Sequence, residues 1–359
     1  MKFIHMADMH LDSAFVNLAG KEKLAEERRL EQRKAIKEII DYIKNNNIPY
    51  FFISGDLYEH EYVKRTTIEY VNDLFQAIPN TKIFITPGNH DPYLKNSFYS
   101  QFKWNENVHI FTDKLEIVEE ENIDIYGYGF NDFYMKNNYH NIEIKNKNKI
   151  NILITHGSLD GGSDEDKSYN LMSSKELKQT DFDYIALGHI HKKSYNDYEN
   201  QKIVYPGSAV SLGFDELGDR GVILGDIEKG SLKLEFIKIN SKLFKELELD
   251  ITELKSNEEL IEKINKLELD DNYYKIILTG KRNFEINIQE LLKFVEQKNV
   301  IKIKNHSSIK YDINEIAGGA SLRGIFAKNI LNKINNDNIT QEEKDKLLNA
   351  FEIGMEVLK

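Results

Sequence analysis

The first 90 residues alternate between short apolar runs and longer amphipathic stretches. The apolar runs 3–7, 50–53 and 82–86 have the length and the Ile and Phe content of buried strands. Residues 21–46 place Leu24, Ile36 and Ile40 at helical spacing, and a second helix is expected over 66–78. This β-α-β-α-β order predicts a parallel sheet with helices packed on its faces.

The region from residue 123 to residue 239 is rich in predicted strands. Apolar or alternating runs cover 123–126, 150–155, 184–187, 203–205, 221–227 and 232–239. This pattern predicts a second sheet packed against the first, so the expected fold is α/β, a four-layer αββα sandwich formed by residues 1–240. An acidic, glycine-containing tract at 161–166 is interpreted as a solvated loop or as a rim over a site.

The pattern changes after Asn240. Strands at 245–252, 273–279 and 300–304 alternate with helices at 256–267 and 287–297, which predicts a small α/β cap domain over 241–305. Residues 306–359 are expected to be mostly helical, with one helix over 321–334 and another that begins near Thr340. Glu343 follows Thr340 by three residues, which is the spacing of a capping box.

Composition narrows the class of protein. At 359 residues the chain is longer than one hydrophobic core usually supports, so two or three domains are expected. The absence of cysteine excludes disulfides, zinc–thiolate sites and thiol catalysis. The N-terminal residues lack the pattern of a signal peptide, and no apolar run approaches the ~20 residues of a membrane span. We therefore expect a soluble, cytoplasmic protein.

The net charge of −11 bears on the class of partner. It argues against a free-standing nucleic-acid binder, because such a protein would carry a basic face. It does not exclude an enzyme that acts on phosphodiesters, since metal ions neutralise a local acidic cluster and a partner can supply a basic surface.

Five short polar motifs each follow a predicted strand. They are Asp8-Met9-His10, Gly55-Asp56, Gly88-Asn89-His90-Asp91, Thr155-His156-Gly157 and Gly188-His189-Ile190-His191. Because ligands at the carboxyl ends of strands in one sheet converge, we expect these side chains to meet at one place. One such motif alone would be explained by a turn or a local hydrogen bond, but five in this order predict a metal site.

The donors in these motifs suit a pair of divalent metal ions. Carboxylate, carboxamide and imidazole ligands fit Mn²⁺, Fe²⁺ or Zn²⁺. Asp8 and His10 lie two residues apart on what should be an extended segment, so both are expected to grip one ion, and Asp56 can bridge two. Two such ions clamp a phosphate and activate a water for in-line attack on phosphorus. The motifs therefore predict a dinuclear phosphoesterase.

The other histidines receive separate interpretations. His90 is expected to stabilise developing charge or to protonate the leaving oxygen, with Asp91 orienting its ring. His60 follows Asp56 by four residues, so a role near the site stays open. Three histidines stand apart from the motifs and are interpreted as structural or surface residues: His5, His109 and His140.

Taken together, the motifs resemble those of the calcineurin-like metallophosphoesterases over roughly residues 1–230. The resemblance implies that one metal ion is held by Asp8, His10, Asp56 and His191. It implies that a second ion is held by Asp56, Asn89, His156 and His189. In that arrangement Asp56 bridges the two ions and His90 is catalytic.

Within that family the chain is similar to the DNA-repair exonuclease branch, which includes the SbcD and YhaO types. The similarity rests on residues 2–13, 55–58, 186–192 and 205–208, and on 321–326, which are most like the YhaO type. It implies a DNA substrate, activation by Mn²⁺, and a C-terminal segment, 306–359, that docks an SbcC-like SMC-type ATPase. A homodimer through the N-terminal domain is a further family expectation. Position 59 departs from the pattern, because it is Glu where many relatives have Asp or His.

The leading hypothesis is a metal-dependent hydrolase of DNA phosphodiesters, an exonuclease or endonuclease subunit in DNA repair. A small-molecule phosphodiesterase or phosphatase would use the same ligands, because substrate choice resides in the rim of the site. A scaffold with a vestigial site is a third hypothesis, which the complete ligand set disfavours. Lys192, Lys193 and Arg220 lie near the motifs and are either phosphate contacts or solvated charges.

Overall fold

The computed structural model describes residues 1–15, 22–136, 142–161, 169–194, 202–336 and 339–358. The chain divides into two compact units, Met1–Phe244 and Lys245–Lys359. His140 and most of the 161–166 tract lie outside the described residues. In the ranges that are described, no helix is both long and apolar enough to cross a membrane.

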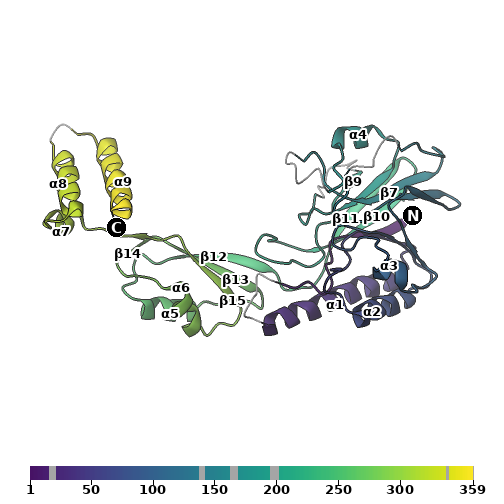
Figure 1. Cartoon of the computed structure of the whole chain (residues 1–359), viewed down its shortest axis with the longest axis horizontal. Coiled ribbons are helices and arrows are strands. Elements are labelled where there is room, and N and C mark those ends of the chain that lie inside the picture. The colour runs from purple at the N-terminus through teal and green to yellow at the C-terminus, as the bar shows by residue number, and fades with distance from the viewer. Residues whose placement is uncertain (16–21, 137–141, 162–168, 195–201, 337–338, 359) are drawn as a thin grey trace. The chain divides into compact units, whose positions relative to one another are not determined.

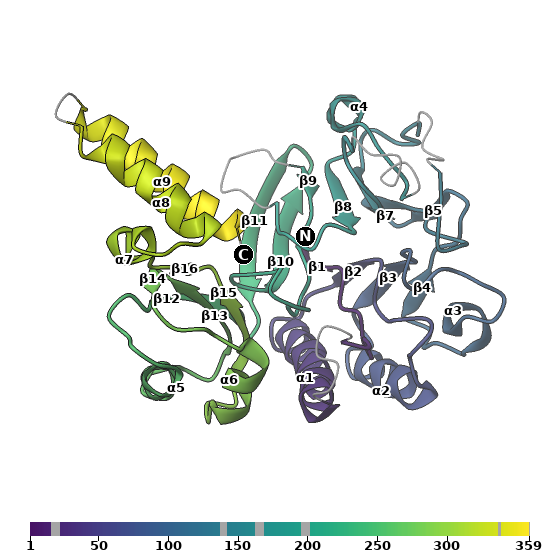
Figure 2. The same cartoon turned by 60° about the vertical axis from the view of Figure 1, so that its left-hand side comes forward.

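The first unit contains two sheets (Figures 1 and 2). Within the described residues, one sheet has the strand order β11-β10-β1-β2-β3-β4, with β1 to β4 parallel. Its strands are β1 (Lys2–Met6), β2 (Tyr50–Ser54), β3 (Lys82–Thr86), β4 (Val108–Ile110), β10 (Gly221–Glu228) and β11 (Ser231–Lys238). The other sheet has the order β5-β6-β7-β8-β9, with β6 to β9 parallel. Its strands are β5 (Glu116–Glu119), β6 (Ile123–Gly127), β7 (Ile150–His156), β8 (Tyr184–Gly188) and β9 (Ile203–Val204).

Alternation along the central strands explains why the two sheets pack together. Side chains on one face of β1, β2 and β3 meet the second sheet in a core rich in aromatic rings. The Phe3 ring lies 5.1 Å from that of Phe52 and 4.7 Å from that of Tyr184 in β8. Large aromatic side chains bury much apolar area per residue, so this layer contributes strongly to the stability of the unit.

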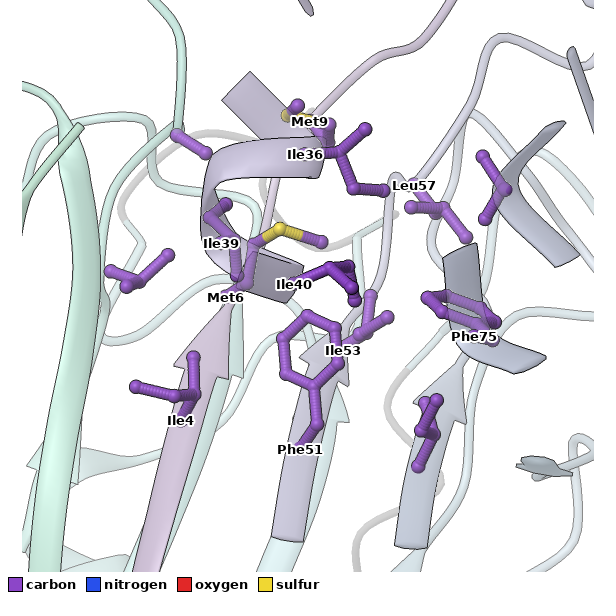
Figure 3. Close-up of a cluster of buried hydrophobic side chains, with 14 of the residues drawn as sticks. Ile4, Met6, Met9, Ile36, Ile39, Ile40, Phe51, Ile53, Leu57 and Phe75 are labelled. Atoms are coloured by element: carbon purple, nitrogen blue, oxygen red, sulfur yellow. The ribbon is translucent and has the colours of Figure 1, made fainter. Parts of the chain in front are cut away.

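The opposite face of the first sheet is covered by helices α1 (Glu22–Asn45) and α2 (Arg65–Gln76). Figure 3 shows how strand residues point toward α1 in this core; the labelled residues include Ile4, Met6, Phe51, Ile53, Ile36, Ile39 and Ile40. The isoleucines of α1 recur at helical spacing, which is the pattern that predicted this helix.

The outer face of the second sheet carries the fourth layer. There, Leu153 and Leu187 pack with Leu177 of the short helix α4 (Ser174–Gln179). The predicted four-layer αββα class is thus confirmed, although this layer holds little helix among the described residues. The short elements α3 (Phe98–Gln101), β4 and β5 were not predicted, since runs of three or four residues show no clear period.

The second unit begins with a small sheet of order β12-β13-β15, in which β13 and β15 are parallel. Its elements are β12 (Phe244–Asp250), α5 (Asn257–Asn265), β13 (Tyr273–Thr279), α6 (Ile288–Phe294) and β15 (Val300–Asn305). The short strands β14 (Lys281–Arg282) and β16 (Ser308–Ile309) pair separately. Apolar residues of α5 and α6, such as Leu260 and Leu291, form one core with the sheet. These are the strand and helix positions that the alternating pattern after Asn240 predicts.

The second unit ends in three helices: α7 (Ile313–Ala317), α8 (Leu322–Ile334) and α9 (Gln341–Val357). The expected capping box is present at Thr340 and Glu343. The segment 321–326 holds α8 and α9 together. Ser321 caps α8, and Arg323 donates to the carbonyl oxygens of Met355 and Leu358 at the end of α9.

His5 is a buried polar residue between the two sheets. The Ser54 hydroxyl donates to the Ala186 carbonyl oxygen, so it accepts from His5 Nε2 at 2.9 Å. His5 Nδ1 then accepts from the Tyr184 hydroxyl at 2.8 Å. Burial lowers the pKa of His5 from 6.5 to about 3, because the apolar surroundings disfavour the charged ring.

Replacement of His5 should change the acid sensitivity of the first unit. Between pH 6.5 and 3 the unfolded chain binds a proton at this ring that the folded chain does not, so the free energy of unfolding falls as pH falls. The slope from one such group reaches about 1.4 kcal/mol per pH unit. We expect His5→Gln to be less stable at pH 7 but to show a flatter slope between pH 4.5 and 6.5. Guanidinium unfolding in EDTA, followed by fluorescence of Trp104, measures this slope. The exposed control His306→Gln should keep the wild-type slope, and equal slopes for wild type and His5→Gln would contradict the assignment.

Candidate metal centre

The five motifs come together at the carboxyl ends of β1, β2, β3, β7 and β8. Asp8, Asp56 and Asn89 follow β1, β2 and β3, while His156 ends β7 and His189 follows β8. Hydrogen bonds join these segments: the Asp8 amide donates to the Gly55 carbonyl oxygen, and the His189 amide donates to Asp8 Oδ1 at 2.9 Å. Residues far apart in the sequence therefore share one buried place.

Two glycines allow the sheets to approach at this place. A Cβ at Gly188 would lie 1.8 Å from the Ser54 carbonyl oxygen, and one at Gly55 would lie 2.2 Å from His156 Nδ1. Gly55 also has φ +86°, which L side chains rarely adopt. Any larger residue at either position would push apart the strands that carry the expected ligands.

Four of the expected ligands adopt positive φ: Asp8 (51°), His10 (47°), Asp56 (53°) and His189 (102°). The prediction of an extended segment at Asp8 and His10 is therefore wrong. Their backbone turns through the left-handed region, and the His10 amide donates to the Asp56 carbonyl oxygen at 2.9 Å. Such conformations cost about 1–3 kcal/mol each and persist where the surroundings enforce them, often at functional sites.

One set of donors consists of Asp8, His10 and His191, whose ligand atoms lie within 4.8 Å of one another. The Nε2 atoms of His10 and His191 are 3.1 Å apart. Each ring hydrogen-bonds through Nδ1 to a carboxylate: Glu59 for His10 at 2.8 Å and Glu216 for His191 at 2.6 Å. A neutral ring that donates from Nδ1 keeps its lone pair on Nε2, so two lone pairs face each other. Asp8 Oδ2 is buried and has no hydrogen-bond partner in the described part of the chain. A cation held among these atoms satisfies all three.

The second set consists of Asp56, Asn89, His156 and His189. His156 Nδ1 donates to the Ser54 carbonyl oxygen at 2.8 Å, which leaves Nε2 as an acceptor when the ring is neutral. That atom lies 3.0 Å from Asn89 Oδ1 and 3.3 Å from Asp56 Oδ2. Asn89 Oδ1 is also 3.1 Å from His189 Nδ1. With His156 neutral, its Nε2 atom, Asn89 Oδ1 and Asp56 Oδ2 are acceptors that face one another, as at a site that holds a divalent ion.

Asp56 of the second set also lies beside the first set, so it links the two. Its Oδ2 atom lies 3.6 Å from His10 Nε2 and 3.3 Å from His156 Nε2. Its Oδ1 atom accepts from the His90 amide at 2.8 Å, which fixes the carboxylate plane. This is the position that a carboxylate shared by two ions would occupy.

Without metal, protons supply the positive charge that this site requires. Burial alone would disfavour charged rings, but Asp56 raises the pKa of His156 to about 9, and Glu216 and Asp8 raise that of His191 to about 9. Asp56 is also buried, yet His156 and His10 hold the pKa of its carboxyl well below the usual value. Divalent ions in the same place would displace those protons, so metal binding is coupled to proton release.

The residue that contacts the His90 ring is Glu59 rather than Asp91. Glu59 Oε2 lies 2.9 Å from His90 Nδ1, and the other Glu59 oxygen contacts His10. Asp91 is buried and accepts from the amides of Gly88, Asp56 and Leu57, and from the Tyr99 hydroxyl. The interpretation of Asp91 as the residue that orients His90 is thus corrected: its carboxylate holds together the segments that follow β2 and β3.

Glu59 and Glu216 were missed as parts of the site. The departure at position 59 was the available signal, because a carboxylate three residues after a metal-binding Asp can reach the same cage. Glu216 carried no comparable signal, since it reaches His191 from a distant segment and also accepts from the Ser208 hydroxyl at 2.7 Å.

The three cations expected near phosphate do not share one role. Arg220 is buried, and its guanidinium donates to the carbonyl oxygens of His191 and Leu217, so it supports the His191 segment instead of facing substrate. Lys193 Nζ lies 3.8 Å from the centre of the Phe236 ring. Lys192 is exposed. Neither of the two interpretations offered for Arg220, a phosphate contact or a solvated charge, describes this buried side chain.

Comparison with known proteins agrees with this geometry. A model of the calcineurin-like phosphoesterase family matches residues 1–193. The chain is 27% identical over 266 residues to the uncharacterized metallophosphoesterase YhaO of Bacillus subtilis, covering 71% of this chain and 64% of that protein. It is 24% identical over 388 residues to the SbcD component of the SbcCD nuclease of Staphylococcus epidermidis, covering 97% of each. It is 26% identical over 287 residues to the DNA double-strand break repair protein Mre11 of Methanocaldococcus jannaschii, covering 74% of each.

Among solved structures, the crystal structure of TT1561 of Thermus thermophilus matches 66% of this chain and 98% of that chain. The TM-score is 0.37 and the identity 9%, so this likeness carries no weight in the assignment.

The carboxylates behind His10 and His191 should tune metal affinity. Removing such a partner typically weakens metal binding by about 10- to 100-fold, because the ring loses its orientation and basicity. We expect this loss for Glu216→Gln and Glu59→Gln, measured by titration of EDTA-stripped protein with Mn²⁺ in a calorimeter. The exposed control Glu106→Gln removes one negative charge from the same unit and should bind like wild type. Wild-type affinity in both site variants would show that these carboxylates do not act on the metal ligands.

Proposed function

Because the chain belongs to the calcineurin-like phosphoesterase family, we propose that it hydrolyses DNA phosphodiesters as a nuclease subunit in DNA repair. The observation that carries the phosphoesterase part is the pair of donor sets that Asp56 links. We further propose that the site holds two divalent ions, with Mn²⁺ as the first candidate. The proposed location is the cytoplasm, where DNA is accessible.

The chain's own residues define where each ion would be held. Asp8, His10, Asp56 and His191 would hold one ion, and Asp56, Asn89, His156 and His189 would hold the other. When bound, such a pair of ions polarises the phosphoryl group and lowers the pKa of water toward neutrality. The glycines and positive-φ residues keep these ligands in place before substrate arrives, so little reorganisation is needed on binding.

His90 is placed to act as the general acid. Its side chain is 45% exposed, whereas the expected ligands around it are mostly buried. Burial lowers its proton affinity, but the hydrogen bond to Glu59 and the charge of Asp56 raise its pKa to about 9. In the metal-free protein the ring is therefore protonated near neutral pH, and with Nδ1 donating to Glu59, the Nε2 proton is the one that would pass to the leaving oxygen.

The DNA substrate is supported by the named functions of relatives. The alignment with the SbcD component of the SbcCD nuclease extends over nearly the whole of both chains. The Mre11 relatives are named as DNA double-strand break repair proteins. By contrast, YhaO is named only as an uncharacterized metallophosphoesterase.

Replacement of His90 should separate chemistry from metal binding. Loss of a general acid typically lowers kcat by about 10²- to 10⁴-fold. We expect this loss for His90→Asn on linear duplex and single-stranded DNA with Mn²⁺, with two ions still bound per chain by calorimetry. Bis-p-nitrophenyl phosphate serves as a generic diester in the same assay.

Comparison of DNA with the generic diester distinguishes the proposed function from its alternatives. DNA cleavage that disappears in His90→Asn supports the proposal. Turnover of the generic diester without DNA cleavage, even after an SbcC-like ATPase is added, would favour a small-molecule phosphodiesterase or phosphatase. Loss of a metal ion from His90→Asn would instead assign His90 as a ligand.

We also propose that the C-terminal helices dock the ATPase partner. In the segment 321–326, Ser321 caps α8 and Arg323 joins α8 to the end of α9, whereas Leu322 is 67% exposed and Ile325 is 55% exposed. On α9, Ile353 and Val357 are also exposed and lie one turn apart. Apolar side chains grouped on a helix surface are typical of a surface that packs against a partner.

Charge placed on this surface should weaken partner binding without changing basal hydrolysis. Burying a carboxylate in an apolar contact is costly, so Ile325→Asp should reduce co-purification with the SbcC-like ATPase at least about tenfold. Diester hydrolysis by the isolated chain should stay at the wild-type rate, because Ile325 is remote in sequence from every expected ligand. The matched control Lys328→Asp alters an exposed position on the same helix. Unchanged co-purification of the ATPase with Ile325→Asp would contradict the proposal that these helices dock the partner.

A further inference from the structure

A cavity of about 320 Å³ opens beside the candidate metal centre, in the first unit. It shares Glu59, Asn89 and His90 with the site, so a phosphate held there would lie at the edge of the cavity. Most of the remaining wall is aromatic, with Tyr62, Phe133, Tyr134 and Tyr169 among its residues. The proposed phosphodiesterase chemistry gives this cavity no role.

The aromatic wall is joined to a metal ligand. The Tyr169 ring lies 5.0 Å from the His189 ring, with 31° between the planes. The Tyr134 ring lies 5.8 Å from that of Tyr169, at 39°. Three rings therefore run from His189, a half-buried ligand of the site, to Tyr134, which is 65% exposed.

Backbone pairing fixes this row of rings. Tyr169 forms a β-bridge with Met135, the neighbour of Tyr134. The Ser158 amide, two residues after His156, donates to the Tyr169 carbonyl oxygen at 3.0 Å. The aromatic wall is thus held to the segment that carries an expected ligand, and its position relative to the site is set by the fold.

The charge of the cavity selects against phosphate. Away from His90, which lies at the edge shared with the metal centre, none of the described lining residues is Lys or Arg, and Glu59 and Glu61 are acidic. A backbone phosphate would be repelled there, whereas an uncharged planar ring would stack on the tyrosines. His60 also lines the cavity, and its ring lies 5.9 Å from that of Phe133.

We propose that this cavity binds the nucleobase of the nucleotide whose phosphate lies at the metal centre. The inference rests on the proposed function and deepens it, because a base in this cavity cannot be paired with its complement. The enzyme then selects an unpaired nucleotide, at a single strand or a frayed end. Stacking on aromatic rings tolerates every base, so the cavity recognises the unpaired state and not the sequence.

The experiment compares binding of a nucleotide with binding of the same sugar phosphate without its base. Full-length protein loaded with Mn²⁺ is titrated in a calorimeter with thymidine 5′-monophosphate, thymidine 3′-monophosphate and 2-deoxyribose 5-phosphate. One stacked base is worth about 5- to 150-fold in affinity. Wild type should therefore bind at least one of the nucleotides about tenfold or more tightly than the sugar phosphate.

Variants test whether the preference for the nucleotide over the sugar phosphate depends on the aromatic rings of the cavity. Tyr134→Ala should reduce it at least about fivefold, and Tyr134→Phe should retain it because the ring remains. Phe294→Ala removes an aromatic side chain of similar exposure from the second unit and should keep the wild-type preference. Circular dichroism of each variant tests whether the fold is intact. Because Tyr134 is exposed, its replacement should leave the fold unchanged.

The outcomes distinguish the cavity from the proposed function. Equal affinity of wild type for nucleotides and sugar phosphate, including no measurable binding of either, overturns the base-binding cavity. An unchanged preference in Tyr134→Ala overturns it as well. A nucleotide preference that depends on Tyr134 supports the cavity even if DNA is not cleaved; that result would refute only the DNA substrate and leave a nucleotide phosphoesterase.

Discussion

Where the segments after the strands meet, nitrogen and oxygen atoms that accept hydrogen bonds face one another across 3.0–3.6 Å, and positive charge between them is what makes the arrangement stable. Much of the surrounding structure serves this constraint. Gly55 and Gly188 remove side chains that would hold the segments apart. The Asp91 carboxylate accepts hydrogen bonds from amides of the segments after β2 and β3. Those segments therefore cannot separate without leaving this buried carboxylate unpaired.

Much of the fold could be predicted from the chain, because its strands and long helices have strong periods. The parallel sheet with α1 and α2 follows from the spacing of isoleucines and from the apolar runs of β1, β2 and β3. The small sheet and helices after Asn240 follow in the same way. Short elements such as β4 and β5 could not be predicted, since their pairing depends on neighbours distant in sequence and not on local pattern.

The candidate site was predictable in its composition but not in its local geometry. The motifs identify which side chains converge, because strand order and strand ends are enough for that. The left-handed backbone at Asp8 and His10 could not be foreseen, since nothing local favours it and tertiary hydrogen bonds impose it. The partners of the rings were hidden for the same reason: Glu216 and Glu59 reach His191 and His10 from other segments, and Asp91 turns toward amides instead of its neighbour.

The expected ligands are spread over a long stretch of sequence, and this affects how the first unit unfolds. Asp8 and His191 lie at opposite ends of the region that holds every expected ligand, and the chain has no cysteine with which to join them. An ion gripped by both would act as a removable cross-link across a very long loop, the kind of closure that restricts an unfolded chain most. Metal would then govern the lifetime of the folded unit, and a chelator would shorten it as a reducing agent does for a disulfide-bonded protein.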